Sequence, residues 1–320
     1  MTKMVGGSAV PVSRAGVSDQ RWMMGRMGWD LAAAAIFVAT HARVLDRRRL
    51  AVLLDDGADP TAVVAALDAY RNSDGGYGWA LEPDLRSSTS QPVGAMHALE
   101  VLADIADVAS DRPREMCDWL AGNSLADGGI PFGLPHADSQ GSAGHWTSAD
   151  PTASSLQMTA QLAAQAHRLA RWRQDVAGHS WLAAATDYCL TKIENLDQPN
   201  PYELMFVLRF LDAAAARDDR AGALVARFAG LVTSDGPTLV AGGAEGEALH
   251  LLDFTPYADA PSRLIFGRAT VAVDLERLAG LQQPDGGWTV DYTVFSPAAV
   301  LEWRGYATVQ AIRILRGGSL

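Results

Sequence analysis

Cysteine is almost absent from this sequence. Only Cys117 and Cys189 occur among the 320 residues, and both fall in segments with helical spacing. Two such positions cannot supply the framework of bridges that holds small secreted domains together. We therefore expect a reducing compartment, the cytoplasm, and we predict that both cysteines are small residues of the core.

Long apolar runs and an excess of positive charge are missing as well. The longest apolar run, residues 31–39, is about half as long as a bilayer crossing requires. Residues 1–18 lack the apolar block of a signal peptide and are predicted to be a flexible tail, which leaves residues 19–320 as one domain. The 37 acidic residues exceed the 26 basic ones and are spread along the chain, so the net charge is −11. Nucleic acids and anionic membrane surfaces are therefore disfavoured as partners.

Several catalytic signatures are also absent. The sequence contains no G-x-S-x-G, no phosphate-binding glycine loop, no dinucleotide fingerprint and no H-E-x-x-H, so no motif favours a hydrolase, a kinase or an oxidoreductase. Residues 55–59 spell the metal-diphosphate motif D-D-x-x-D, but Gly57 and Pro60 predict a turn there in place of a helix. We expect no metal site from these residues.

What the chain does contain is a repeated turn. Asp-Gly-Gly occurs at residues 74–76, 127–129 and 285–287, with a weaker Asp-Gly-Pro at residues 235–237. The intervals indicate a period of roughly 50 to 54 residues, with one copy lost near residues 178–181. A period of this length is typical of repeat architectures, and the chain is long enough for about six units.

Each unit is predicted to be a pair of helices, an outer one with a single apolar stripe before the turn and a more apolar, alanine-rich inner one after it. Outer helices are predicted at 60–71, 114–123, 181–195, 221–232 and 271–282, and inner helices at 91–108, 151–169, 201–215 and 305–315, with residues 21–54 as the first unit. A proline behind a polar residue marks helix starts at positions 92, 151, 201 and 297. The predicted fold is all-α, an (α/α)6 toroid whose turns all feed inner helices at one mouth.

Two motifs connect these repeats to a known superfamily. Residues 282–288, Gln-Gln-Pro-Asp-Gly-Gly-Trp, match the Q-x-x-D-G-x-W core of the repeat in squalene and oxidosqualene cyclases. The chain resembles the terpenoid cyclase and protein prenyltransferase superfamily of α-helical toroids. Residues 148–153, Ser-Ala-Asp-Pro-Thr-Ala, resemble the D-x-D-D-T-A motif of class II cyclases, and Asp150 falls on the aspartate that donates the proton. Ser148 and Pro151 replace its acidic neighbours, and the chain holds one toroid where squalene cyclases have two.

The resemblance implies a class II-like terpenoid cyclase or isomerase that starts carbocation chemistry on a small apolar or prenyl substrate. Asp150 is the implied acid, Thr152 its support, and His145 a group that tunes it. The residues expected to bind the substrate are Tyr77, Trp79, Glu82, Asp84, Arg86, Phe132, Trp146, Trp288, Tyr292, Trp303, Arg304 and Tyr306. No cofactor is implied, except Mg²⁺ for a diphosphate substrate. A zinc prenyltransferase is disfavoured because both cysteines fall in or near predicted outer helices.

The residues alone leave two alternatives open. Asp150 before a proline is also the pattern of a helix N-cap, in which the helix dipole favours an ionised carboxylate. Glu82, Asp84 and Glu302 place carboxylates in the predicted mouth loops, where other (α/α)6 barrels act on polysaccharides. The alternative functions are therefore a non-catalytic toroid that binds an apolar or glycan ligand or a protein partner, or a carbohydrate-active enzyme.

Overall fold

The computed structural model describes residues 28–105, 109–138 and 140–318. This part of the chain is mostly helical, which confirms the predicted all-α class. The helices are α2 (Leu31–His41), α3 (Val44–Leu54), α4 (Thr61–Leu67), η1 (Asp68–Tyr70), α5 (Pro92–Asp104), α6 (Arg112–Asn123), α7 (Gly144–Thr147), α8 (Leu156–Ala170), α9 (Gln174–Ala177), α10 (Ser180–Glu194), α11 (Pro201–Ala214), α12 (Asp219–Ala229), α13 (Leu251–Phe254), α14 (Pro261–Phe266), α15 (Arg268–Gly280) and α16 (Pro297–Gly317). The predicted tail of residues 1–18 and the start of the first unit lie outside the described residues.

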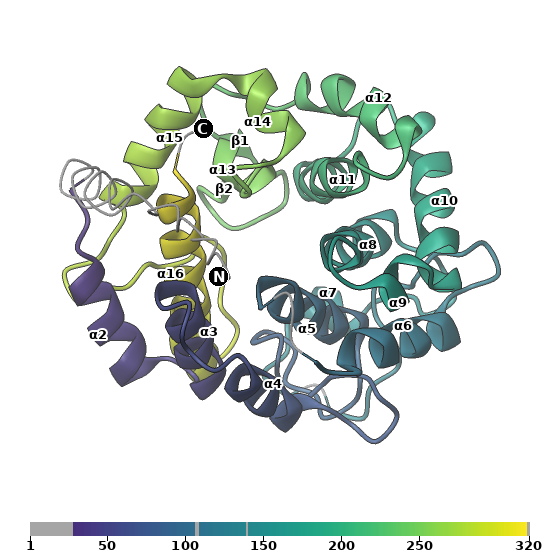
Figure 1. Ribbon diagram of the computed structural model, residues 1–320, viewed down its shortest axis with the longest axis horizontal. Helices are drawn as coiled ribbons and strands as arrows, with labels where there is room; N and C mark the ends of the chain where they lie inside the picture. Colours follow the sequence, from purple (N-terminus) through teal and green to yellow (C-terminus); the bar gives the residue numbers. More distant parts are fainter. Residues whose placement is uncertain (1–27, 106–108, 139, 319–320) are drawn as a thin grey trace, which may run out of the picture.

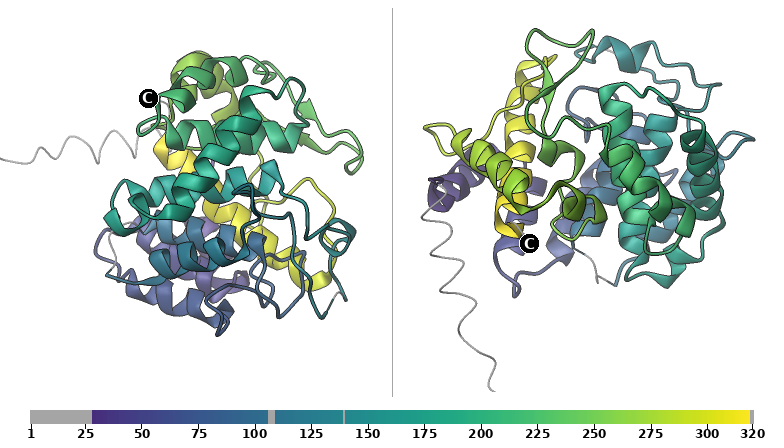
Figure 2. Two further views of the ribbon diagram at one scale, coloured as in Figure 1. Left: turned by 90° about the vertical axis from the view of Figure 1, so that its right-hand side faces the viewer. Right: turned by 90° about the horizontal axis from the view of Figure 1, so that it is seen from above.

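The helices follow one another around a ring. Figure 1 shows α5, α8, α11 and α16 toward its centre and α2, α6, α10, α12 and α15 toward its outside. Helix α8 packs against α5 on one side and against α11 on the other. The last helix, α16, packs against α2 and α3, so the two ends of the described chain lie side by side. Figure 2 shows the same arrangement from two sides.

Burial distinguishes the inner helices α5 and α8 from the outer helix α12, as the sequence predicts. Every residue of α5 from Pro92 to Leu102 is buried, and α8 is buried around most of its circumference. Helix α12 buries only the stripe formed by Ala221, Val225, Phe228 and Ala229. A helix that is apolar on all sides removes that surface from water only inside the molecule. A helix with one apolar stripe covers the core from outside.

The three Asp-Gly-Gly turns have the same backbone geometry. The first glycine of each turn, Gly75, Gly128 or Gly286, has a φ of about 90° (91°, 87° and 92°), which favours glycine strongly. In each turn the aspartate side chain accepts a hydrogen bond from the N–H of the second glycine, at 2.9 to 3.2 Å. Gly236, in the weaker copy, has no positive φ, so the predicted fourth turn does not form in this way.

Proline marks three of the four predicted helix starts. Helices α5, α11 and α16 each begin at a proline. The prediction is wrong for Pro151, because α8 begins at Leu156 behind Ser155, whose side chain accepts a hydrogen bond from the N–H of Met158 (3.2 Å). The chain before Ser155 is held instead by a bridge between Ser154 and Pro131, which keeps it out of the helix.

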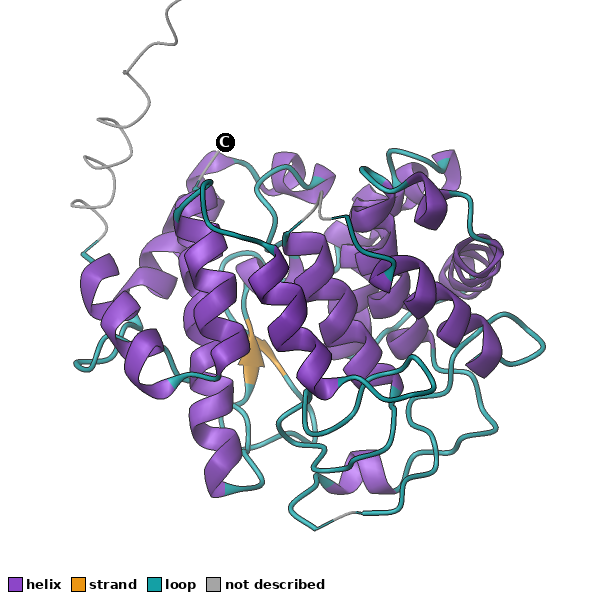
Figure 3. Ribbon diagram, turned by 60° about the horizontal axis from the view of Figure 1, so that its bottom comes forward, coloured by secondary structure: helices purple, strands orange, loops and turns teal. Residues whose placement is uncertain are grey.

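The inner helices have a common polarity. Figure 3 shows long loops gathered at one end of the ring and the C-terminus at the other. The loops that follow the Asp-Gly-Gly turns lead into the N-termini of α5, α8 and α16. We call this loop-rich end the mouth, and the end where α5, α8 and α16 finish the far rim.

A small sheet lies in the loop before α13. Strands β1 (Thr238–Leu239) and β2 (Ala248–Leu249) pair antiparallel. Among the described residues, no helix combines the length and apolar character needed to cross a membrane. Cys117 and Cys189 are buried and free, as predicted for small core residues.

Candidate functional site

The loop of residues 78–90, between the first turn and α5, positions the site. Its entry holds two consecutive non-glycine residues, Trp79 (φ 54°) and Ala80 (φ 57°), in the left-handed region. Such conformations cost free energy and cluster at functional sites. The loop folds back so closely that a Cβ atom on Gly78 would lie 2.4 Å from the carbonyl oxygen of Thr89. This packing holds the loop in one conformation, which carries two carboxylates into the interior.

Asp84 is the first of these carboxylates, and it joins the loop to the last part of the chain. Its Oδ2 accepts a hydrogen bond from Trp303 Nε1 (2.7 Å), and its Oδ1 accepts one from the backbone N–H of Phe295 (3.1 Å). Burial raises the pKa of Asp84 and Glu82 adds to the effect, which together outweigh the lowering by the two hydrogen bonds. The raised pKa favours the protonated carboxyl, the form that a general acid requires.

Glu82 is the second carboxylate, and it pairs with a histidine of α5. Its Oε2 lies 2.8 Å from His97 Nε2, and its Oε1 accepts a hydrogen bond from the N–H of Asp84 (3.2 Å). Glu82 and His97 are only 6% and 5% exposed. Glu82 thus acts electrostatically on the Asp84 carboxyl, and both carboxylates are buried.

Aromatic rings surround these carboxyl groups. Trp303 lies edge-on to Tyr292 and Tyr306, with ring centroids 5.2 and 5.6 Å apart. Burial deep in the molecule raises the pKa of both tyrosine hydroxyls, yet each tyrosine keeps part of its surface exposed. Both tyrosines are therefore half-buried residues whose rings pack on Trp303.

His145, on the short helix α7, belongs to the same mouth. Its ring lies 4.8 Å from that of Trp146, which in turn stacks on Phe132 at 4.8 Å. Burial lowers the pKa of His145, while the carboxylates of Glu82 and Glu247 act in the opposite direction. The neutral imidazole is favoured. The carboxylates that raise its pKa come from two loops that are far apart in the sequence.

A third carboxylate reaches the mouth from the residue before β2. Glu247 Oε1 accepts a hydrogen bond from the hydroxyl of Tyr202 (2.5 Å), at the start of α11, and its Oε2 accepts one from the N–H of Ala244 (2.7 Å). Burial raises the pKa of Tyr202, and the hydrogen bond to Glu247 raises it further. Tyr202 also acts electrostatically on Tyr292. The loop around Glu247 and the loop of residues 78–90 therefore belong to one site.

The inner helices carry a buried network of charges. Arg49 Nη2, on α3, donates to Glu100 Oε1 (2.9 Å) and to Asp104 Oδ2 (2.8 Å), both on α5. The Tyr306 hydroxyl donates to Glu100 Oε2 (2.8 Å), and Arg168 Nη2 of α8 donates to Asp104 Oδ1 (2.9 Å). Burial alone would raise the pKa values of Glu100 and Asp104, but the arginines lower both. The interior of the ring is thus ionic and polar here, unlike a hydrocarbon pocket.

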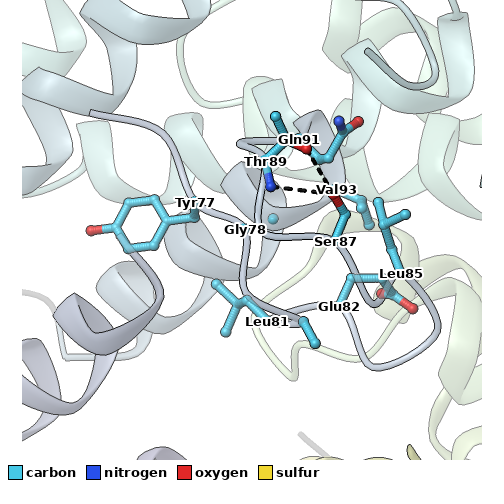
Figure 4. A pocket seen from close by; sticks show the side chains of 11 residues that line it. Tyr77, Gly78, Leu81, Glu82, Leu85, Ser87, Thr89, Gln91 and Val93 are labelled. Carbon is cyan, nitrogen blue, oxygen red and sulfur yellow. Dashed lines mark hydrogen bonds between the residues drawn. The ribbon is translucent and has the colours of Figure 1, made fainter. Parts of the chain in front are cut away.

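Two cavities near the first turn do not contribute to the site. One, of about 10 Å³, lies behind Glu82 between the loop and the start of α5 (Figure 4). It has room for about one water molecule and none for a substrate. The other is an open depression of about 540 Å³ on the outer surface beside α6. Its arginines are paired with acids, Arg71 with Glu115 at 3.0 Å and Arg114 with Asp118 at 2.5 Å.

Many of the predicted site residues do meet at the mouth or the centre of the ring. Arg86 belongs to this set because it forms an ion pair with Glu302, at the start of α16. The predicted residues that come together are Glu82, Asp84, Arg86, Phe132, His145, Trp146, Tyr292, Trp303 and Tyr306.

Four predicted substrate-binding residues lie elsewhere. Tyr77 and Trp288 are packed in the core, 1% and 2% exposed, because the aromatic residue after each turn packs over the helix end. Trp79 is exposed and donates to Asn72 Oδ1 (2.7 Å). Arg304 turns away from the mouth and pairs with Asp285 Oδ1 of the last turn (2.7 Å).

The predicted acid, Asp150, does not have the surroundings that its role requires. It lies in an exposed turn, where its Oδ1 accepts hydrogen bonds from the hydroxyl (2.7 Å) and the N–H (2.8 Å) of Thr152. These hydrogen bonds lower the pKa of Asp150 and favour the ionised form. Nor is it a helix N-cap, because α8 begins at Leu156. His145, expected to tune Asp150, is influenced by Glu82 instead.

Sequence reasoning missed the polar face of α5. His97, Glu100 and Asp104 are not among the predicted site residues, yet α5 contacts the mouth and the centre through them. Their spacing of three and four residues puts them on one side of a helix. A line of ionisable side chains on an otherwise alanine-rich, buried helix was the signal that could have identified them.

No known protein family has a sequence profile that matches this chain, and no curated protein matches it either. Within the described ranges, no three His, Cys, Asp or Glu side chains are grouped so as to hold a metal ion. The function must therefore be inferred from the side chains at the mouth themselves.

Proposed function

We propose that this chain is an acid–base enzyme with its site at the mouth of an (α/α)6 toroid and a polar, hydroxylated substrate of the carbohydrate class. Asp84 acts as the general acid, and Glu82, held by His97, acts as the general base. One observation carries the proposal: Asp84, with its raised pKa, is buried beside the Glu82–His97 pair (2.8 Å) among aromatic rings.

The polar interior favours this substrate class over a long hydrocarbon. A prenyl chain in the centre would pack against the charged side chains of Arg49, Glu100 and Asp104, which offer it little apolar surface. A sugar can donate hydroxyl hydrogen bonds to carboxylates, while its apolar ring face packs on Trp303 or Tyr292. Substrate sites commonly combine a few polar groups with aromatic walls in this way.

The proposed reaction is hydrolysis of a glycosidic bond. Asp84 gives its proton to the leaving oxygen as the bond to the sugar carbon breaks, and Glu82 takes a proton from the water that attacks that carbon. His97 keeps the Glu82 carboxylate oriented through the 2.8 Å contact. The rate is expected to fall as the pH rises through the raised pKa of Asp84, because the acid is then ionised.

A second candidate is the class II-like cyclase or isomerase that the repeats resemble, acting on a small prenyl or apolar substrate. It is favoured by the rings of Trp303, Tyr292 and Tyr306 around Asp84, since aromatic faces stabilise nearby cations. In this reading Asp84 takes the place of Asp150 as proton donor.

The two candidates are separated by a substrate panel. Purified wild type, Asp84→Asn and Asp150→Asn are incubated with neutral and charged oligosaccharides, with prenyl diphosphates of several lengths and with squalene, and products are identified by mass spectrometry. We expect a shortened oligosaccharide from wild type and Asp150→Asn, and none from Asp84→Asn. A cyclised prenyl product alone would select the second candidate. Binding of a ligand without any product would select a non-catalytic ring.

A further inference from the structure

The first Asp-Gly-Gly turn meets its neighbouring outer helix differently from the other two turns. Each turn packs on the next outer helix around the ring, which is α6, α10 or α2. A Cβ atom on the second glycine of each turn would lie 2.5 to 2.8 Å from an aromatic ring of that helix. The rings are those of Trp119, Tyr188 and Phe37. These three contacts are equivalent, so the three outer helices can be compared position by position.

The first glycine of the second and third turns packs closely on the backbone of its helix. A Cβ atom on Gly128 would lie 3.0 Å from the carbonyl oxygen of Ala184, and one on Gly286 would lie even closer to that of Ala33. Both alanines stand four residues before the aromatic residue of their helix. The small alanine side chain therefore lets these two turns rest directly on the helix.

The first turn is held away from its helix by an ion pair. In α6 the position of those alanines is occupied by Glu115, four residues before Trp119. Glu115 Oε2 lies 3.0 Å from Arg71 Nη2 and 2.7 Å from Arg112 Nη1. A Cβ atom on Gly75 would meet Arg71 Nη2, at 3.8 Å, in place of a helix carbonyl group. Partly exposed ion pairs contribute at most about 1 kcal/mol, so stability alone does not explain why close packing is given up here.

The gap between the first turn and α6 is the open depression of about 540 Å³, a volume typical of small-molecule sites. Gly122, near the C-terminal end of α6, widens it, because the equivalent positions of α10 and α2 carry Thr191 and Thr40. A Cβ atom on Gly122 would have no described atom within 4 Å. Two departures from the repeat, four residues before and three residues after the aromatic residue, therefore open the same space.

The polar groups in the depression carry charges of both signs, and these charges are already paired. Arg114 Nη1 lies 2.5 Å from Asp118 Oδ2, and Asp118 Oδ1 lies 3.2 Å from His179 Nε2. Asp74 Oδ1 accepts a hydrogen bond from the hydroxyl of Ser90 (2.8 Å). The side chains of Arg114 and Asp118 nevertheless remain 45% and 55% exposed. An ionic ligand would find its counter-charges matched, whereas donors and acceptors of both kinds are open to a neutral polar ligand.

We propose that this depression binds a neutral, polyhydroxylated ligand, the sugar units of an oligosaccharide, on the outer surface of the ring. A hydroxyl group both donates and accepts hydrogen bonds, so one sugar can use the carboxylates and the guanidinium group together. The depression lies on the outer surface beside α6 and is therefore separate from Asp84 and Glu82 at the mouth. The proposal does not depend on the proposed reaction.

Binding is tested by NMR titration of Asp84→Asn protein, in which the depression is intact and the proposed acid cannot consume the sugar. The reporter is the indole N–H of Trp119, which lines the depression and donates to Asp74 Oδ2 (3.2 Å). The probes are maltotriose, cellotriose, xylotriose and N-acetylchitotriose. N-acetylglycinamide, inorganic phosphate and arginine serve as neutral-amide and charged comparison ligands. We expect a saturable shift of the Trp119 signal with at least one trisaccharide and none with the comparison ligands.

Two glycine substitutions make the test decisive. Gly122→Gln places a side chain inside the depression and should weaken sugar binding at least tenfold. Gly280→Gln makes the same change at the end of α15, outside the depression, and should leave binding unchanged. Neither Cβ atom would have a described atom within 4 Å, and glutamine favours a helix more than glycine does, so both variants keep the fold.

Three results would each overturn the proposal. The first is that no trisaccharide shifts the Trp119 signal. The second is that a comparison ligand shifts it at the same or a lower concentration, which would make the site ionic or peptide-binding. The third is that Gly122→Gln binds the sugar as tightly as Gly280→Gln does, which would place the sugar outside the depression.

Discussion

The two ends of the ring differ in the charge that they gather. At the mouth, Glu82, Asp84 and Glu247 meet aromatic rings and a neutral histidine, whereas the far rim gathers Arg168, Arg313 and their neighbours around Tyr257. The inner helices have their N-termini at the mouth and their C-termini at the far rim. The helix dipoles stabilise anions at the first and cations at the second. Because the inner helices share one direction, their dipoles favour charges of opposite sign at the two ends.

A layer of paired, buried charges runs from the middle of the ring to the far rim. Glu100 and Asp104 share Arg49, and Asp104, the last residue of α5, also pairs with Arg168. The far rim therefore holds an acid as well as arginines.

The largest effect is expected from removing the acid at the mouth. Asp84→Asn keeps the size of the side chain but cannot deliver a proton, so the turnover of an identified substrate should fall by about 10²–10⁴-fold. Steady-state kinetics measure this, with Asp150→Asn as the matched control that retains near wild-type turnover. Equal rates for the two variants would remove Asp84 from the mechanism.

The next largest effect is expected in the layer between the ends. Arg49→Met removes the counter-charge that the buried Glu100 and Asp104 share, which should lower the free energy of unfolding by about 3–5 kcal/mol. Urea unfolding monitored by circular dichroism measures the change. The exposed Arg220→Met variant should unfold at nearly the wild-type midpoint. If both variants unfold at the same urea concentration, the network does not stabilise the ring.

A smaller, pH-dependent effect is expected near the far rim. Burial raises the pKa of Asp212 to about 6, above its unfolded value, so the folded protein loses stability as the pH rises from about 4 to about 6. Asp212→Asn cannot titrate, and relative to the wild type it should gain about 2–3 kcal/mol between pH 4 and pH 7. Thermal or urea unfolding at several pH values measures this difference, and a constant difference across this range would contradict the assigned pKa.

The smallest effect is expected for the ion pair at the edge of the mouth. Arg86 and Glu302 are partly exposed, so Glu302→Gln should lower the free energy of unfolding by less than about 1 kcal/mol. Turnover should change much less than in Asp84→Asn, because Glu302 does not touch the Asp84–Glu82 pair. If Glu302→Gln loses as much activity as Asp84→Asn, the Arg86–Glu302 pair is part of the active site.

Much of the fold could be predicted from local patterns. The three Asp-Gly-Gly sequences predicted the turns correctly, because a φ near 90°, as at Gly75 and its counterparts, favours glycine over other residues. Apolar residues on most sides of α5 and α8 predicted that both helices are buried. The failures occurred where two local signals competed, as at Pro151, where Ser155 made the better helix cap and moved the start of α8.

The structure brings many of the predicted site residues together, but it places Asp150, the predicted acid, in an exposed turn. The loop with Glu82 and Asp84 was recognised as polar, and its approach to Glu302 and Trp303 followed from closing the ring. Asp150 was selected because a short motif resembled a known acid. Its exposure in a turn could not be read from that motif, since burial depends on the neighbours that a loop meets after folding.

The sequence by itself determined the helical class, the three equivalent turns and the burial of the inner helices, because helix periodicity and glycine conformation act within a few residues. Only the tertiary structure decided that Asp84 is buried against Trp303 and that its pKa is raised. Asp84 meets Trp303 and Glu100 meets Tyr306 across more than 200 residues of chain. Such contacts form only when the last helix packs against the first, and the pKa values at the mouth follow from that closure.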